Sequence, residues 1–202
     1  MAVVGNRSDP HGRHDWHSAD YVNDWIKKDV TRDEDRRPML TRMIERIPRQ
    51  RHDEIQVLDV GAGYGELTRC VLEVFPKARV ICQDFSEPML EHARERLVDF
   101  IDRIDYVKSD LSQSNWVAPF EQSFDAVVSS IAIHNVRFSE RIRGIYQEVA
   151  QLLAPGGSFL NCDLVFDNIE THLGWLEADF EDVTVFEQEG RMTTFGGYKK
   201  PQ

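Results

Sequence analysis

The sequence predicts an α/β protein, with a doubly wound, mostly parallel β-sheet and helices on both faces. Three observations predict this fold class. From Ile55 onward, short apolar runs of strand length alternate with segments of helical periodicity. A turn containing three glycines joins the first strand to the helix after it. Near the C-terminus, two β-like segments separated only by Gln188–Gly190 predict an antiparallel hairpin.

Each strand of the parallel part is expected at a short apolar run. The run from Phe124 to Ile131 is apolar and continuous, which is typical of a strand buried on both faces. The expected parallel strands cover residues 55–60, 79–83, 104–108, 124–131 and 158–166, and the hairpin strands cover 182–187 and 191–198.

Proline and a capping serine set the limits of the helices between these strands. Pro76 ends the first helix because it cannot continue the hydrogen-bond ladder. Ser86, followed by Pro88, is a favoured start for the second. The expected helices cover residues 66–75, 87–100, 140–153 and 172–178.

The segment before the sheet has a different organisation. Residues 1–14 are polar, with Gly, Pro and His, and a flexible tail is expected there. Residues 15–50 carry two amphipathic helices, expected over 16–29 and 33–47, which form a candidate lid. Residues 51–202 make up the sheet domain.

Composition narrows the range of partners. The 24 Lys and Arg residues against 35 Asp and Glu residues give a formal net charge of −11, which disfavours binding to phosphate backbones. No apolar run approaches the roughly 20 residues of a membrane-spanning helix, and the three cysteines are too scattered for a disulfide framework or a zinc site. We therefore expect a cytoplasmic protein with no nucleic-acid, membrane or metal partner.

The most informative segment is VLDVGAGYGELT, residues 57–68. Its glycines, Gly61, Gly63 and Gly65, let a ligand approach the backbone closely. Dinucleotide-binding turns have the third glycine three places after the second, where this chain has Glu66 instead. An acid at that helix start would repel a pyrophosphate, so a cationic or zwitterionic ligand is favoured. Asp59, just before the turn, favours the same kind of ligand.

Two further acids follow the next two predicted strands. Asp84 lies roughly 20 residues past the turn, where related folds place an acid on the ribose hydroxyls. Asp110 follows the third strand and can accept a hydrogen bond from an adenine amino group. Each acid taken alone could equally be a helix cap. Their shared position at the carboxyl edge of the sheet favours a ligand site.

At this point the sequence resembles a class I S-adenosylmethionine-dependent methyltransferase, over about residues 55–198. The segments VLDVGAGYGELT, ICQDFSEPML, VKSDL, FDAVVSSIAIHNV and LLAPGGSFLNCD resemble successive motifs of that family. The resemblance implies a seven-stranded sheet in the order 3-2-1-4-5-7-6, with an antiparallel strand 7. It also implies S-adenosylmethionine as cofactor, S-adenosylhomocysteine as product and no metal.

The resemblance implies roles by position. The methionine part of the cofactor would lie on the acid and turn residues, Asp59, Gly61, Ala62, Gly63 and Gly65. Asp84 would bind the ribose, with Phe85 beside the adenine. Asp110 and Leu111 would bracket the adenine, while Ser129 and Ile131 would line the floor under the sulfonium.

His134, just past the fourth strand, is the candidate general base, because imidazole titrates near neutral pH. It could instead orient the acceptor or cap the next segment. Tyr21 and Trp25 could cover the cofactor as parts of the lid, or could belong to an ordinary packed helix. Trp25 and Ile131 are also candidate acceptor contacts, together with His134.

The leading functional interpretation is methyl transfer to the oxygen, nitrogen or carbon of a small molecule, by in-line displacement. One alternative is a silent, S-adenosylmethionine-binding regulatory protein, which the polar SSIAIHN segment disfavours. The other is a nicotinamide oxidoreductase, which the glycine spacing and the terminal hairpin disfavour. The sequence identifies neither the acceptor nor the oligomeric state.

Overall fold

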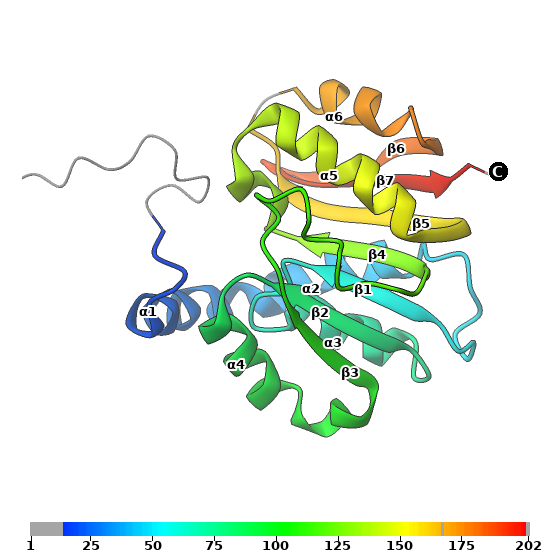
Figure 1. Cartoon of the computed structure of the whole chain (residues 1–202). Helices are drawn as coiled ribbons and strands as arrows, with labels where there is room; N and C mark the ends of the chain where they lie inside the picture. The colour runs from blue at the N-terminus through cyan, green and yellow to red at the C-terminus, as the bar shows by residue number, and fades with distance from the viewer. Residues whose placement is uncertain (1–13, 167, 201–202) are drawn as a thin grey trace, which may run out of the picture.

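A computed structural model describes residues 14–166 and 168–200. Its centre is a seven-stranded sheet in the order β3-β2-β1-β4-β5-β7-β6 (Figure 1), which confirms the predicted order. β1 to β5 are parallel, and β7 is antiparallel to both β5 and β6. The strands are β1 (Gln56–Val60), β2 (Arg79–Asp84), β3 (Ile104–Lys108), β4 (Phe124–Ser130), β5 (Leu153–Leu164), β6 (Phe180–Glu189) and β7 (Met192–Lys199).

Strand β5 begins earlier than the sequence predicts. Leu153 already pairs with Phe124, so the Pro155-Gly156-Gly157 run lies inside the strand. The register of the β4–β5 pair shifts between Phe124 and Ala126. This irregularity is how the sheet accommodates a sequence that reads as a turn.

The helices are α1 (Ala19–Asp29), α2 (Asp33–Ile44), α3 (Glu66–Val74), α4 (Glu87–Arg96), α5 (Ser139–Leu152) and α6 (Ile169–Leu176). The start expected at residue 16 was wrong, because the Ser18 hydroxyl caps α1 by accepting the amide proton of Tyr21. Helix α4 ends at Arg96, and a 3₁₀ segment (Val98–Arg103) replaces its expected last turn. The Ser86 cap before α4 is confirmed.

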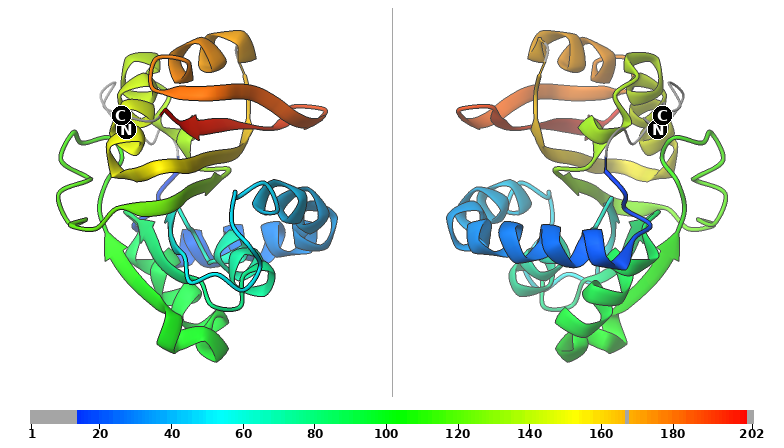
Figure 2. Two further views of the ribbon diagram at one scale, coloured as in Figure 1. Left: turned by 90° about the vertical axis from the view of Figure 1, so that its right-hand side faces the viewer. Right: turned by 90° about the vertical axis from the view of Figure 1, so that its left-hand side faces the viewer.

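Two apolar cores fill the space between the sheet and its helices. One contains buried residues of α2, α3 and α4, such as Leu40, Val71 and Leu90. The other contains residues of α5 and α6, such as Ile145 and Leu176. Figure 2 shows α2 and α5 on opposite sides of the sheet. This arrangement leaves the carboxyl ends of the parallel strands free to form a site.

Helix α1 lies at the edge of the sheet toward which the parallel strands point (Figure 1). A third apolar cluster forms there, with Trp16 and Val22 from the N-terminal segment, Tyr64 from the glycine turn and Met89 from α4. The candidate lid is therefore packed against the site. The expected flexible tail lies outside the described residues, apart from His14. No helix in the described part of the chain is long and apolar enough to cross a lipid bilayer.

Candidate active site

A cavity of about 990 Å³ opens at the carboxyl edge of the sheet. This volume lies at the upper end of the range of about 300–1,000 Å³ that is typical of small-molecule sites. Its border includes Asp59 from β1, Asp84 from β2, Ser130 from β4 and Leu164 from β5, together with Trp25 from α1. Segments that are distant in the sequence therefore meet around one cavity.

The glycine turn after β1 forms one wall of the cavity. Gly61 has a φ of +67°, and a Cβ there would collide with the Cβ of Ala132. Gly63 has a φ of +54°, but nothing lies within 4 Å of where its Cβ would stand. Gly61 is therefore required by packing, whereas Gly63 leaves open space beside the backbone.

Residues at the end of β2 hold this turn. The Gly63 amide donates to Asp84 Oδ2 over 2.9 Å, and the Gly61 amide donates to Gln83 Oε1 over 3.0 Å. Asp84 Oδ1 accepts the amide proton of Ser86 over 2.8 Å. Asp84 thus fixes the turn and caps the start of α4 while also bordering the cavity. Each carboxylate oxygen can accept more than one hydrogen bond.

Asp59 is fully buried at the end of β1. Its Oδ2 accepts a 2.6 Å hydrogen bond from the Thr68 hydroxyl, whereas Oδ1 has no hydrogen-bond partner among residues 14–166 and 168–200. Burial, with a smaller effect from the Asp84 charge, raises the pKa of Asp59 to about 7. An unpartnered carboxylate oxygen at the cavity border is suited to a cationic group of a ligand.

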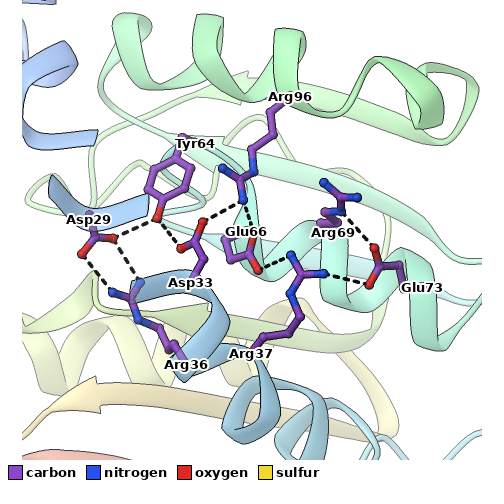
Figure 3. A network of polar contacts seen from close by, with 9 residues as sticks. All are labelled: Asp29, Asp33, Arg36, Arg37, Tyr64, Glu66, Arg69, Glu73 and Arg96. Atoms are coloured by element: carbon purple, nitrogen blue, oxygen red, sulfur yellow. Dashed lines mark hydrogen bonds and ion pairs between the residues drawn. The ribbon is translucent and has the colours of Figure 1, made fainter. Parts of the chain in front are cut away.

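A buried polar network ties the N-terminal helices to the glycine turn (Figure 3). The Tyr64 hydroxyl lies 2.9 Å from Asp29 Oδ2 and 2.7 Å from Asp33 Oδ1, and its single proton can serve one carboxylate at a time. Arg36 neutralises Asp29 with two parallel hydrogen bonds of 2.9 and 3.1 Å. Burial and these two carboxylates raise the pKa of Tyr64 well above its usual range.

The same network corrects the expected role of Glu66. Its carboxylate makes ion pairs with Arg96, at 2.5 Å, and with Arg37, at 2.8 Å (Figure 3). Arg96 also pairs with Asp33 at 2.7 Å. Two arginines from other helices therefore neutralise Glu66, so it presents no free negative charge that would repel a phosphate. The electrostatic argument from this residue was wrong.

The opposite wall follows β4 and β5. Ile131 has a left-handed φ of 52°, which turns the chain into the 3₁₀ segment Ile133–Val136. His134 in this segment borders the cavity, and its Nδ1 lies 2.5 Å from Asp163 Oδ1. Asp163 Oδ2 accepts the backbone amide proton of His134 over 3.0 Å. The carboxylate at the end of β5 therefore holds both the ring and the backbone of His134.

The cavity brings together most, but not all, of the site residues predicted from the sequence. Those at its border are Trp25, Asp59, Gly61, Ala62, Gly63, Asp84, Phe85, Leu111, Ile131 and His134. Four others are outside that border, namely Tyr21, Gly65, Asp110 and Ser129.

These four residues have structural contacts of their own. Tyr21 makes a hydrogen bond with His14, which does border the cavity. Gly65 packs against Leu97. Asp110 Oδ1 accepts the Ser112 amide proton, and the Ser129 hydroxyl donates to the Val60 carbonyl over 2.8 Å. Each of them supports an element that borders the cavity.

Sequence reasoning missed three residues that shape the site: Gln83, Tyr64 and Asp163. Gln83 bridges the Gly61 amide and the Ser109 carbonyl, and so joins the ends of three strands. Asp163 lies inside the strand expected over residues 158–166, and inside β5, so its position did not mark it as a site residue in the way that Asp84 was marked. The partners of Tyr64 lie more than thirty residues away in the sequence, and no local pattern indicates them.

A seven-stranded sheet with an antiparallel β7, and a glycine turn at its carboxyl edge, defines the class I Rossmann-like methyltransferase fold. The methyltransferase domain family model matches residues 57–157, which is half of the chain. The chain therefore belongs to this family. Within the described ranges, no group of three His, Cys, Asp or Glu side chains is arranged to hold a metal ion.

Two curated relatives illustrate the family. The chain is 37% identical over 109 residues to a demethylmenaquinone methyltransferase from Clavibacter sepedonicus. The matched region covers 54% of this chain and 40% of that protein. It is 33% identical over 113 residues to a trans-aconitate 2-methyltransferase from Acidovorax sp. (strain JS42). The matched region covers 54% of this chain and 37% of that protein. The chain thus matches less than half the length of either relative.

Solved structures support the same fold. An O-methyltransferase family protein from Burkholderia thailandensis superposes with a TM-score of 0.69 at 19% identity, covering 93% of this chain and 61% of that chain. The structure of PigF with SAH (S-adenosylhomocysteine) superposes with a TM-score of 0.74 at 15% identity, and the match covers 98% of this chain and 64% of that chain. At these identities the likeness concerns the fold alone.

Proposed function

We propose that this chain is an S-adenosylmethionine-dependent methyltransferase that acts on a small-molecule acceptor. The observation that carries the proposal is the meeting of an unpartnered Asp59 oxygen, an open glycine turn and the Asp84 carboxylate in one cavity. Membership of the methyltransferase domain family supports it.

The residues of the cavity fit the cofactor. Asp59 Oδ1, which has no hydrogen-bond partner within residues 14–166 and 168–200, would accept a hydrogen bond from the ammonium group of the methionine part. The open side of Gly63 would receive that part of the ligand, because no Cβ fills the space. Asp84 would accept hydrogen bonds from the ribose hydroxyls, with Phe85 and the buried Leu111 supplying apolar contacts for the adenine.

When bound, the cofactor supplies an electrophilic methyl group on a sulfonium. The residues of this chain would then hold the acceptor in line with the methyl–sulfur bond and exclude water. Such orientation can contribute about 7–11 kcal/mol in favourable systems. Trp16 and Trp25 cover one side of the cavity, where their rings meet edge to face at 5.3 Å. We propose that residues 15–50 act in this way as a lid.

Several features favour a small acceptor. The net charge of −11 opposes binding to nucleic acid. Apolar side chains at the cavity border, among them Met39, Leu40, Leu164 and Met192, provide surface for the carbon skeleton of a metabolite. The two relatives named above methylate demethylmenaquinone and trans-aconitate, respectively. The three cysteines are buried and unpaired, which supports a reducing compartment such as the cytoplasm.

The experiment is a screen for methyl transfer from S-adenosylmethionine labelled on its methyl group to a metabolite library, run beside calorimetry with S-adenosylhomocysteine. We expect binding of one equivalent of S-adenosylhomocysteine and a labelled small-molecule product. Binding without any transfer would support the silent regulatory alternative. An absence of binding would overturn the proposal.

A further inference from the structure

We infer that Asp163 positions His134 as a proton acceptor, and that the acceptor substrate is therefore a hydroxyl compound or a carbon acid. This inference rests on the proposed function and specifies its substrate class. A thioether or a carboxylate already offers an unprotonated lone pair to the methyl group, and an amine does so once its ammonium form has lost a proton to solvent. None of these acceptors therefore needs such a device. A hydroxyl or a C–H group becomes a strong nucleophile only as it loses its proton.

The geometry around His134 fixes which ring nitrogen is available. Nδ1 lies 2.5 Å from Asp163 Oδ1, and a carboxylate at this position can only accept the Nδ1 proton. The neutral ring then carries its lone pair on Nε2. Nε2 has no hydrogen-bond partner within residues 14–166 and 168–200. It is also not fully buried, so it keeps some accessible surface. The basic nitrogen is therefore accessible from the cavity that His134 borders.

Asp163 is held too firmly to be an incidental neighbour. Its Oδ1 also accepts the Leu164 amide proton over 2.8 Å, and its Oδ2 accepts the His134 amide proton over 3.0 Å. The side chain of Asp163 is 5% exposed, whereas that of His134 is 17% exposed. The buried carboxylate and the cavity-facing ring thus form an ordered pair, with the orienting group behind the reacting group.

Besides Asp163, the neighbours of His134 are His14, Arg137 and Phe166. His14 interacts electrostatically with both Arg137 and His134. The Arg137 amide donates to the His134 carbonyl over 3.2 Å. The Phe166 ring lies 5.7 Å from the His134 ring, with the Arg191 guanidinium on that same phenyl ring at 5.8 Å. Burial, followed by the charges of Arg137 and His134, lowers the pKa of His14. Asp163 is the one carboxylate that pairs with His134 in the described part of the chain.

The step is a proton transfer coupled to methyl transfer. Nε2 of His134 takes the proton from the acceptor O–H or C–H group, and the electron pair of that bond's heavy atom forms the new bond to the methyl carbon. The methyl–sulfur bond breaks with its electron pair remaining on sulfur. The imidazolium that results lies against the Asp163 carboxylate and later returns its proton to water.

The test uses the full-length chain and its Asp163→Asn and His134→Gln variants. Nitrogen NMR of the histidine rings should report an Nδ1-protonated His134 in the wild type. Asp163→Asn should redistribute that proton, because an amide offers a donor as well as an acceptor. Tyr146→Phe is the matched control, since it removes the 2.8 Å partner of His172, a ring that does not border the cavity. It should leave the His134 signals unchanged.

Kinetics with an acceptor found in the library screen gives the second readout. Asp163→Asn should lower kcat by about 10²–10⁴-fold with little change in KM, and Asp163→Glu should restore part of the loss. The labelled product should carry its methyl group on a former hydroxyl oxygen or carbon atom.

The failures of the two proposals are distinguishable. Loss of S-adenosylhomocysteine binding by the wild type would reject the proposed function. Intact binding together with an unchanged His134 tautomer in Asp163→Asn would reject this inference alone. A product methylated on an amine or a carboxylate would also reject it, whatever the tautomer.

Discussion

The amide of Gly63 donates to the carboxylate of Asp84 over 2.9 Å, so the end of β2 holds the turn that follows β1. The carboxylate that is proposed to bind ribose is therefore also the one that shapes the wall for the methionine part. This contact couples the two halves of the proposed cofactor site. The turn contains two kinds of glycine. Packing against Ala132 requires Gly61, whereas Gly63 leaves space for a ligand.

Gly63→Ala should retain the fold and lose the cofactor. The left-handed φ of +54° costs a non-glycine residue about 1–2 kcal/mol, and the added methyl group meets no protein atom within 4 Å. It would instead occupy the space beside the turn that the ligand needs. Calorimetry should show at least a tenfold loss of affinity for S-adenosylhomocysteine.

Gly156→Ala is the matched control for that variant. Gly156 has a φ of +72° with nothing within 4 Å of its Cβ position, and it does not border the cavity. It should show a similar loss of stability with unchanged affinity. Equal affinities in the two variants would contradict the proposed position of the cofactor. Gly61→Ala should be the most destabilised of the three, because its methyl group would collide with Ala132.

The affinity for S-adenosylhomocysteine should depend on the ionisation of Asp59. Burial raises the pKa of this carboxyl to about 7 in the free protein. The ammonium group of the ligand favours the charged form, so affinity should rise by roughly tenfold between pH 6 and pH 8, as the ionised fraction increases. Titrations across this range should show the rise in the wild type and a flat, weaker profile in Asp59→Asn. A pH-independent wild-type affinity would remove Asp59 from the site.

The same carboxyl should make the free protein less stable as the pH rises. Its pKa in the folded state is higher than the ordinary value of 3.8 for an aspartic acid, so the folded state binds the proton more tightly. The resulting stabilisation is complete below pH 3.8 and is lost as the pH rises to about 7. Urea unfolding of wild type and Asp59→Asn, compared at pH 5 and pH 8, should show the decrease only in the wild type. Equal decreases in both proteins would assign the effect to other groups.

Tyr64→Phe should destabilise the protein by about 1–3 kcal/mol, the usual cost of leaving a buried acceptor without its donor. The Tyr64 hydroxyl lies within hydrogen-bond distance of two buried carboxylates, Asp29 and Asp33, and donates its proton to one of them at a time. Tyr106→Phe is the control, because that hydroxyl makes only a 3.5 Å contact with a carbonyl. Chemical denaturation should separate the two variants. Equal stabilities would indicate that the network contributes little.

Trp25→Ala should weaken binding of S-adenosylhomocysteine by about tenfold if α1 acts as a lid, since truncating an aromatic wall exposes the ligand to water. Trp175→Ala is the control, because Trp175 packs against Tyr146 and His172 away from the cavity. We expect Trp175→Ala to lose stability while keeping its affinity. An unaffected Trp25→Ala protein would show that α1 is only a structural support.

Local sequence pattern predicted most of the sheet. The strand over Ile104–Lys108 matches the expected one at both ends, and the strand order followed from the family resemblance. Continuous apolar runs specify buried strands because both faces must be covered. The pattern failed at Leu153, where a turn-like run continues as a strand. It also failed at the start of α1, where Ser18 was not recognised as the cap.

The charge partners at the site could not be predicted in this way. Glu66 meets Arg96, and His134 meets Asp163, only because the fold brings separate strands and helices together. Ion pairs of this kind leave no periodic signal in the sequence. The sequence therefore indicated which residues carry charge, and the structure determined which of those charges are neutralised.

The most direct test of the account is calorimetry of the wild-type protein with S-adenosylhomocysteine and, separately, with NAD, both at pH 8. The glycine turn, the unpartnered Asp59 oxygen and Asp84 predict one S-adenosylhomocysteine bound per chain and no heat from NAD. Saturable NAD binding without S-adenosylhomocysteine binding would contradict the account, because it would assign the same turn to a pyrophosphate.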